Sequence, residues 1–164
     1  MRRSAVLATT AAMLLGVATL SAQAANFAGH WVLVPDTTAM GGGGGGGRGF
    51  GGGGLGQEVT IAQDAKTLTI TRTTQNGESK QVYNLDGSES SNTMSMRGND
   101  MVQKSTAKWD GGKLVITTNY DMGNGPVTTT MALSMSGGNL VVETTRPGRG
   151  GGAPTTRTST YKKG

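Results

Sequence analysis

The feature that most constrains the fold of this chain is an alternation of apolar and polar residues, repeated in short runs between turn-forming dipeptides. The clearest run places Val127, Thr129, Met131, Leu133 and Met135 on one face of an extended strand. A period of two is that of a β-strand with one buried face. Threonine is frequent in these runs, and its β-branched side chain suits a pleated sheet. The pattern therefore predicts an all-β protein.

About ten such runs can be placed along the chain. They are separated by turn signals at the spacing of an antiparallel up-and-down meander, and we predict that this meander closes into a small barrel. The expected strands cover residues 30–35, 58–63, 67–74, 79–85, 89–96, 100–109, 113–120, 126–135, 139–145 and 155–162.

The first 24 residues have the composition of a secretory signal peptide. Arg2 and Arg3 precede an apolar stretch, and Ala22-Gln23-Ala24 matches the A-x-A cleavage pattern. A membrane anchor is the alternative, but the apolar run is shorter than the roughly 20 residues that a span needs. We therefore expect a signal peptide over residues 1–24 and one barrel domain over residues 25–164.

The chain contains no cysteine. This excludes disulfides, thiolate metal sites, a cysteine nucleophile and the lipid-modified cysteine of a bacterial lipoprotein. The expected location is therefore the periplasm or the cell exterior. Two of the fifteen basic residues would leave with the signal peptide while all ten acidic residues stay. The remaining domain is only weakly basic, which argues against a nucleic-acid partner.

The connections between the expected strands differ in length at the two ends of the meander. Tight turns near residues 64, 87, 111 and 137 fall at one end. The longer connections, 40–57, 97–99, 121–125 and 146–154, fall at the other end, together with the Asn76-Gly77 turn. Residues 40–57 are rich in glycine and are expected to form a flexible loop or lid. Function in such scaffolds tends to lie at the end with the longer loops.

The head of the first expected strand reads Phe27-Ala28-Gly29-His30-Trp31, which contains a Gly-x-Trp motif. With this motif, the long first connection and a basic residue near the last strand, the chain resembles the lipocalin and wider calycin barrels. It is most similar to small exported bacterial proteins of the Phe-x-Gly-x-Trp kind. Ten strands in place of eight point toward the fatty-acid-binding relatives or toward a barrel of its own kind, and the middle lipocalin motif has no match.

The resemblance implies a barrel that is closed at one end and binds one small apolar or amphipathic molecule. It also implies a structural floor at the closed end, formed by Gly29, Trp31 and Trp109. In lipocalins a basic side chain of the last strand covers the tryptophan. Lys162 or Arg157 would take that place here.

Candidate ligand contacts fall into two groups. Flexible methionine side chains suit an adaptable apolar lining, although ordinary core filling also explains them. The expected lining is Met94, Met96, Met131, Leu133 and Met135. A rim at the loop-bearing end would suit a carboxylate or phosphate head group, although a solvated loop edge explains the same residues. The expected rim is Arg48, Phe50, Arg97, Arg146 and Arg149.

Patterns typical of an enzyme are missing from the sequence. His30 is the sole histidine, so it supports neither a metal cluster nor a serine-based triad. Asp64, Asp86, Asp110 and Asp121 belong to expected turns, where a carboxylate bonds the backbone. We expect a non-catalytic protein without a metal or cofactor.

The expected function is the binding of a small apolar or amphipathic ligand inside the barrel. The alternative is a cell-envelope structural or interaction protein whose loops, rich in glycine and arginine, contact polymers or other proteins. The pattern indicates no transmembrane span. It identifies neither the ligand nor a partner.

Overall fold

The computed structural model describes residues 25–35, 54–74, 77–96, 99–121, 123 and 125–164. Within these ranges the strands are β1 (Gly29–Leu33), β2 (Glu58–Gln63), β3 (Thr67–Thr74), β4 (Gly77–Asn84), β5 (Glu89–Met96), β6 (Asn99–Asp110), β7 (Lys113–Asp121), β8 (Pro126–Ser136), β9 (Asn139–Arg146) and β10 (Thr155–Lys163). A short 3-10 turn, η2 (Arg149–Gly151), lies between the last two strands. Each strand begins and ends within two residues of its predicted bounds.

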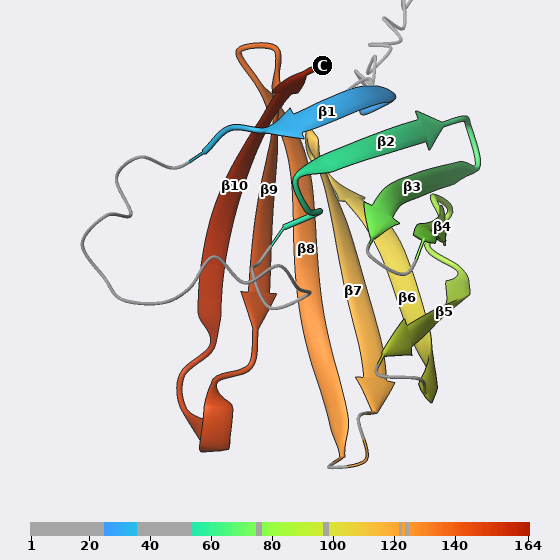
Figure 1. Ribbon diagram of the computed structural model, residues 1–164, viewed down its shortest axis with the longest axis vertical. Helices are drawn as coiled ribbons and strands as arrows, with labels where there is room; N and C mark the ends of the chain where they lie inside the picture. Colours follow the sequence, from blue (N-terminus) through green and yellow to red (C-terminus); the bar gives the residue numbers. More distant parts are fainter. Residues whose placement is uncertain (1–24, 36–53, 75–76, 97–98, 122, 124) are drawn as a thin grey trace, which may run out of the picture.

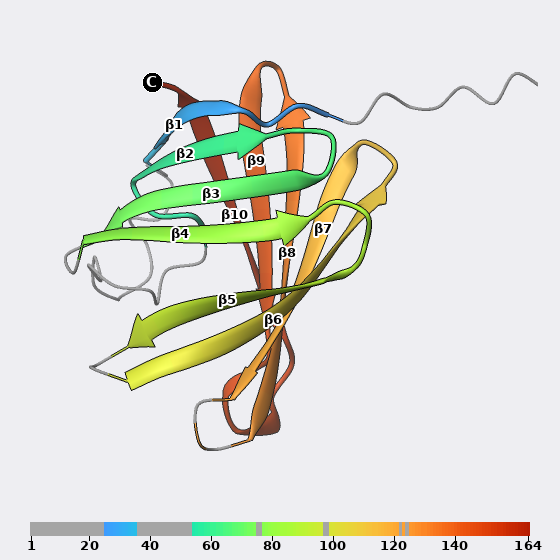
Figure 2. The same cartoon turned by 90° about the vertical axis from the view of Figure 1, so that its right-hand side faces the viewer.

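All ten strands belong to one antiparallel sheet of order β4-β3-β2-β1-β10-β9-β8-β7-β6-β5. Apart from β4 and β5, strands that follow one another in sequence pair with each other. β1 also pairs with β10, with Trp31 opposite Lys163 and Leu33 opposite Tyr161. The sheet folds over so that β1 to β4 cross β7 to β10 steeply (Figures 1 and 2). The predicted ten-stranded meander and its closure into a nearly complete barrel are confirmed.

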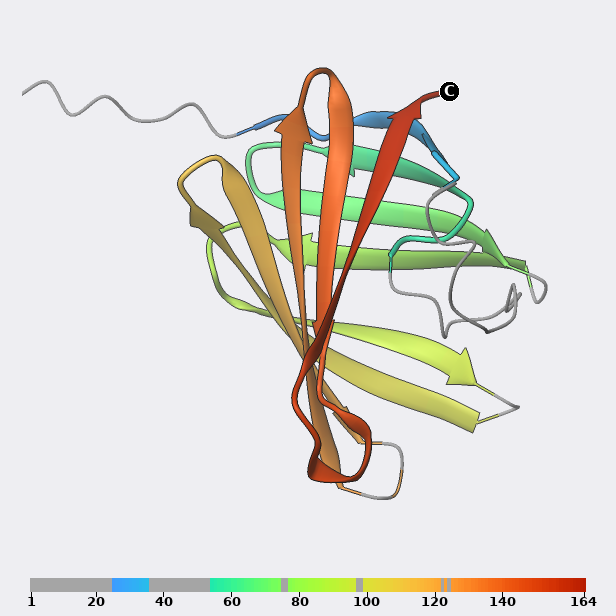
Figure 3. The ribbon, with the colours of Figure 1, turned by 90° about the vertical axis from the view of Figure 1, so that its left-hand side faces the viewer.

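The strand order ends at β4 and β5, where side chains take the place of strand pairing. The side-chain amide of Asn92 on β5 accepts the N–H of Val82 at 2.8 Å and donates to the Val82 carbonyl at 2.9 Å. Near the β4–β5 turn, Asn84 Nδ2 donates to the Glu89 carbonyl at 3.2 Å. Away from that turn the two strands diverge (Figures 2 and 3). The seam between β4 and β5 is therefore held by side-chain hydrogen bonds near the β4–β5 turn, and the two strands separate away from it.

The two ends of the barrel carry different connections. The β2–β3, β4–β5, β6–β7 and β8–β9 turns are short and define what we call the sealed end. In the first of them Asp64 Oδ1 accepts the N–H groups of Lys66 and Thr67, both at 2.7 Å. Gly111 and Gly137 begin two others with φ of 59° and 56°, which glycine adopts without steric cost. The remaining connections lie at the opposite end, which we call the open end.

The hydrophobic core fills the barrel toward the sealed end. Its strand residues come from the inward positions predicted by the alternation, and each is at most 2% exposed: Trp31, Val59, Ile61, Leu68, Ile70, Leu114, Ile116, Leu133, Leu140 and Val142. Leu114 lies opposite Leu133, which lies opposite Val142, so one apolar layer crosses three strands. Burial of each such side chain stabilises the fold by about 1.5–3 kcal/mol.

Threonine side chains cover the outer face of β6 to β10. A row of directly opposite residues crosses these five strands and consists of Thr106, Thr117, Thr130, Thr145 and Thr156. The hydroxyls of Thr145 and Thr156 share a hydrogen bond of 2.8 Å. The polar half of each alternating run thus faces solvent. Among the described residues, no helix has the length and hydrophobicity needed to cross a bilayer.

Candidate functional site

An aromatic floor closes the barrel at the sealed end. Trp31 is fully buried, and its indole Nε1 donates to the Phe27 carbonyl at 2.8 Å. The Phe27 ring stacks on Trp109, with ring centroids 5.8 Å apart and planes inclined by 10°. The Phe27 N–H in turn donates to Gln63 Oε1 at 2.8 Å. These contacts fix the entry of the chain into β1 and leave the floor without an opening for solvent at Trp31.

The cation over Trp31 is Lys163, whose Nζ lies 5.5 Å from the ring centroid. The prediction of Lys162 or Arg157 for this position is wrong. Lys163 is opposite Trp31 in the register, whereas Lys162 is opposite Val32 and is exposed. Neighbouring residues of a strand point to opposite faces, so a shift of one residue reverses the side. A Cβ at Gly29 would lie 3.4 Å from Lys163 Cε, so glycine leaves the lysine its room.

Inward positions change from apolar to polar between the core and the open end. On β3 the inward series runs from Leu68 and Ile70 to Arg72, and β9 continues from Val142 to Thr144. We call this layer the polar belt; it consists of Arg72, Gln81, Gln103, Ser105, Thr118 and Thr144. The interior is therefore amphipathic: its part toward the sealed end is apolar, and its part toward the open end is polar.

Arg72 carries the positive charge of the polar belt. Its guanidinium donates to Gln81 Oε1, and Gln81 Nε2 donates to Gln103 Oε1 at 2.8 Å. Burial lowers the pKa of Arg72, while the proximity of Tyr83 and Tyr161 acts in the opposite direction. A guanidinium in a protein nevertheless stays protonated at neutral pH. The belt therefore holds a cation in a poorly solvated interior, where its electrostatic interactions are stronger than in water.

Two buried tyrosines adjoin Arg72. Burial raises the pKa of Tyr83 to about 12, although Arg72 opposes the shift. Burial also raises the pKa of Tyr161, against backbone N–H groups and Arg72, which lower it. Both phenols are therefore protonated at neutral pH, and each retains a hydroxyl proton for hydrogen bonding. The tyrosines add polar groups to the interior without adding negative charge beside Arg72.

Hydroxyl groups complete the belt on β6, β7 and β9. Ser105 and Thr118 share a hydrogen bond of 2.8 Å. Thr144 is only 8% exposed, and its Oγ1 has no hydrogen-bond partner among the described residues. A buried hydroxyl in this state costs about 1–3 kcal/mol, which a bound polar group offsets. Thr144 therefore offers a second polar contact across the interior from Arg72.

The predicted methionine lining is distributed over the length of the barrel. Met94 is 8% exposed and lies opposite Met101, one position beyond the belt toward the open end. Met131 is half-buried against the core, where Leu133 is fully buried, and Met135 is 36% exposed near the β8–β9 turn. The backbone of Met96 ends β5, and its side chain is outside the described part. These residues therefore do not share one level of the interior.

The predicted basic rim lies mostly outside the described residues. Arg48, Phe50 and Arg97 fall there altogether, and Arg149 belongs to η2 with no described side chain. Arg146 ends β9, is half-buried and follows Thr144 on the inward face. Sequence analysis missed Arg72. The available signal was its inward place in the alternation of β3, after Leu68 and Ile70.

Two other polar regions are poor candidates. His30 is exposed on the outer face, with its Nε2 3.9 Å from Glu58 Oε2. Within the described ranges, no three His, Asp or Glu side chains are grouped to hold a metal ion. A surface hollow of about 490 Å³ lies at the sealed end, between Lys66 and Asp86. Asp86 there already accepts the N–H of Ser88 at 2.9 Å, as expected of a turn residue.

No family model matches this chain, and no curated protein is significantly similar to it in sequence. One similar solved structure is zebrafish ileal bile acid-binding protein complexed with cholic acid. It shares 23% sequence identity, and the alignment covers 65% of this chain and 72% of that chain with a TM-score of 0.45. The barrel described above rests on the strand pairing of this chain itself.

Proposed function

We propose that the barrel binds one small amphipathic molecule. Its acidic head group would lie at Arg72, and its apolar tail would lie against the hydrophobic core toward the sealed end. The observation that carries this proposal is the position of Arg72, an arginine on the inward face of β3 directly after Leu68 and Ile70. A guanidinium on an inward face can form charged hydrogen bonds with an anion that enters the interior. An inward guanidinium next to an apolar core suits the two parts of an amphipathic acid, its charged head group and its apolar tail.

The chemistry of the polar belt favours an acid over a neutral head group. The described hydrogen bond of Arg72 goes to the neutral amide oxygen of Gln81. A carboxylate or sulfonate is a stronger partner, because two of its oxygens accept the parallel N–H groups of a guanidinium. Such an acid would compete with Gln81, and Thr144 Oγ1 would supply a further donor. The protonated tyrosines Tyr83 and Tyr161 do not repel it.

Two fluorescent probes of nearly equal shape test the proposal. 8-Anilinonaphthalene-1-sulfonate carries an acidic group, and N-phenyl-1-naphthylamine is its neutral counterpart. Arg72→Met should weaken the binding of the sulfonate by about tenfold or more, because a charged hydrogen bond is worth about 1.5–3 kcal/mol. Its effect on the neutral probe should stay within about twofold, since that probe relies on apolar contacts.

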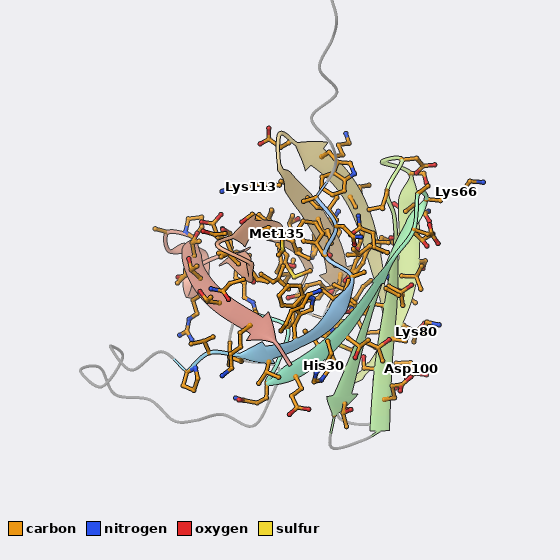
Figure 4. The ribbon with its side chains drawn as sticks, turned by 90° about the horizontal axis from the view of Figure 1, so that it is seen from above. His30, Lys66, Lys80, Asp100, Lys113 and Met135 are labelled. Carbon is orange, nitrogen blue, oxygen red and sulfur yellow. The ribbon has the colours of Figure 1, made fainter. Side chains whose placement is uncertain are left out.

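Lys80→Met is the matched control. It removes one positive charge from the neighbouring strand β4, but Lys80 lies exposed on the outer side of the sheet (Figure 4). It should leave the affinity for both probes unchanged. Equal losses of sulfonate affinity in the two variants would mean that general surface charge attracts the probe. A wild-type protein that binds neither probe would contradict the proposed function.

We also propose that the protein is exported through the segment over residues 1–24. The support is the order of Arg2 and Arg3, an apolar stretch, and Ala22-Gln23-Ala24. Fusion of residues 1–30 to an alkaline phosphatase that is active only after export should give enzyme activity in cells. Replacement of Leu14 and Leu15 by arginine in the same fusion is the control. Equal activity in both fusions would contradict export by this segment.

A further inference from the structure

Leu55 is enclosed in the barrel although it lies outside every strand. It is 1% exposed and belongs to the same core cluster as the residues of β1 to β4 and β7 to β10. The three residues Gly54, Leu55 and Gly56 form a bend immediately before β2. We call them the plug. A connection normally runs over the surface, so an apolar side chain that turns inward from one needs a reason.

The plug is held in place by β10. The Leu55 N–H donates to the Tyr161 hydroxyl at 2.7 Å. A Cβ at Gly54 would lie 2.8 Å from that hydroxyl and 2.9 Å from Ser159 Oγ, so only glycine lets the backbone come this close. After the plug, Leu33 N–H donates to the Gln57 carbonyl at 2.8 Å and begins the pairing with β2. The plug is thus bound through side chains and not through a strand ladder.

Two flanking glycines give the backbone of the plug more conformational freedom than a strand has. Gly54 and Gly56 flank the leucine with φ of 116° and 102°, in a region that favours glycine. An added Cβ at Gly56 would meet nothing within 4 Å, so this glycine serves backbone conformation and not packing. Two glycines on either side of one apolar residue permit a rotation that strand residues such as Ile61 and Ile70 cannot make.

We infer that the plug is a displaceable occupant of the binding site: Leu55 fills the apolar position that the ligand tail takes, and the plug moves out when the ligand enters. This inference rests on the proposed function. Tyr161 couples the two events, because it holds the plug through its hydroxyl and adjoins Arg72. Departure of the plug releases that hydroxyl toward a head group at Arg72. The tail and the head of one molecule therefore both favour the open arrangement.

A closed plug lowers the apparent affinity by the fraction of molecules in which it is open. Any change that weakens the plug without narrowing the interior should therefore tighten the binding of an apolar probe. Tyr161→Phe removes the hydroxyl and keeps the ring. Tyr120→Phe, on β7, is the matched control at a tyrosine that has no described bond to the plug. Leu55→Ala shortens the occupant itself.

The experiment measures the affinity of the full chain for N-phenyl-1-naphthylamine, which has no acidic group and does not depend on Arg72. Leu55→Ala should bind it about fivefold more tightly or better, because a buried leucine no longer competes. Tyr161→Phe should bind it a few-fold more tightly, and Tyr120→Phe should match the wild type. Thermal unfolding checks that each variant is folded, and Tyr161→Phe carries the test if Leu55→Ala is not.

Amide hydrogen exchange gives a direct readout in the unmodified protein. Saturation with the probe should speed exchange at Leu55 about tenfold or more and leave Ile70, in the core of β3, unchanged. Unchanged or slower exchange at Leu55 with bound probe would overturn the plug. Equal probe affinity in all four proteins would also overturn the plug while the proposed function stands. Failure of all four to bind either probe would overturn the proposed function itself.

Discussion

The sealed end and the polar belt use the same strands and the same inward face but fill it with opposite chemistry. At the sealed end Trp31, Leu114 and Leu140 are fully buried and pack against other apolar groups. Farther toward the open end, the inward positions of β3 and β9 hold Arg72 and Thr144. Apolar contacts at the sealed end stabilise the barrel without specifying a ligand. Polar groups in the belt cost stability, and under the proposed function they distinguish one ligand from another.

The difference between the sealed end and the polar belt should be largest for a substitution in the aromatic floor. Trp31→Ala should lower the free energy of unfolding by about 3–5 kcal/mol, because it removes a fully buried indole, its bond to the Phe27 carbonyl and the surface beneath Lys163. Urea denaturation measures this. Trp109→Ala, at a half-buried ring, should cost less. A Trp31 variant that loses probe binding but retains wild-type stability would erase the distinction between floor and belt.

Arg72→Met is expected to have the opposite profile. The free energy of unfolding should change by no more than about 1–2 kcal/mol in either direction, because an apolar side chain of similar length replaces a poorly solvated cation. Sulfonate binding should fall by about tenfold over the same substitution. Urea denaturation and probe titration on one sample give both values. A loss of stability as large as that of Trp31→Ala would show that the belt is part of the framework.

The seam between β4 and β5 provides an intermediate case. Asn92→Leu leaves the N–H and carbonyl of Val82 without the side-chain amide that pairs them, at a cost of about 1–3 kcal/mol. Amide exchange at Val82 should speed up more than exchange at Ile70, which lies within the paired sheet. Asn119→Leu, at an exposed amide that bonds Thr128 on the outer face, should be nearly neutral. Equal effects of the two substitutions would mean that the seam is closed by other contacts.

The smallest expected effect is the acid response of the turns at the sealed end. Hydrogen bonds from the Lys66 and Thr67 N–H groups lower the pKa of Asp64 below its ordinary value of 3.8. The folded pKa is lower than the unfolded one, so this contribution is present above pH 3.8 and is lost as the pH falls through the folded pKa. The urea midpoint followed from pH 5 to pH 2 should drop slightly less in Asp64→Asn than in wild type. A steeper drop in the variant would contradict this assignment.

Alternation along the chain was sufficient to predict ten strands, their bounds and the two ends of the barrel, because a period of two reports directly which side of a sheet each residue faces. The same period applied to Lys163 would have identified the cation over Trp31, but the prediction compared residue types without following the register. Arg72 was missed because arginine is usually exposed, so its inward position was overridden by its chemistry. Leu55 follows no period, and only its tertiary bond to Tyr161 reveals its place.

The pairing of β1 with β10 joins the two strands of the barrel that lie farthest apart in the sequence. Bringing such distant segments together carries a large loop-closure entropy, so this ladder forms late in folding. Until β10 docks, β1 and β9 each present an unpaired edge to other chains. A folding intermediate that lacks only this strand is therefore prone to aggregate, and docking of β10 covers both edges at once.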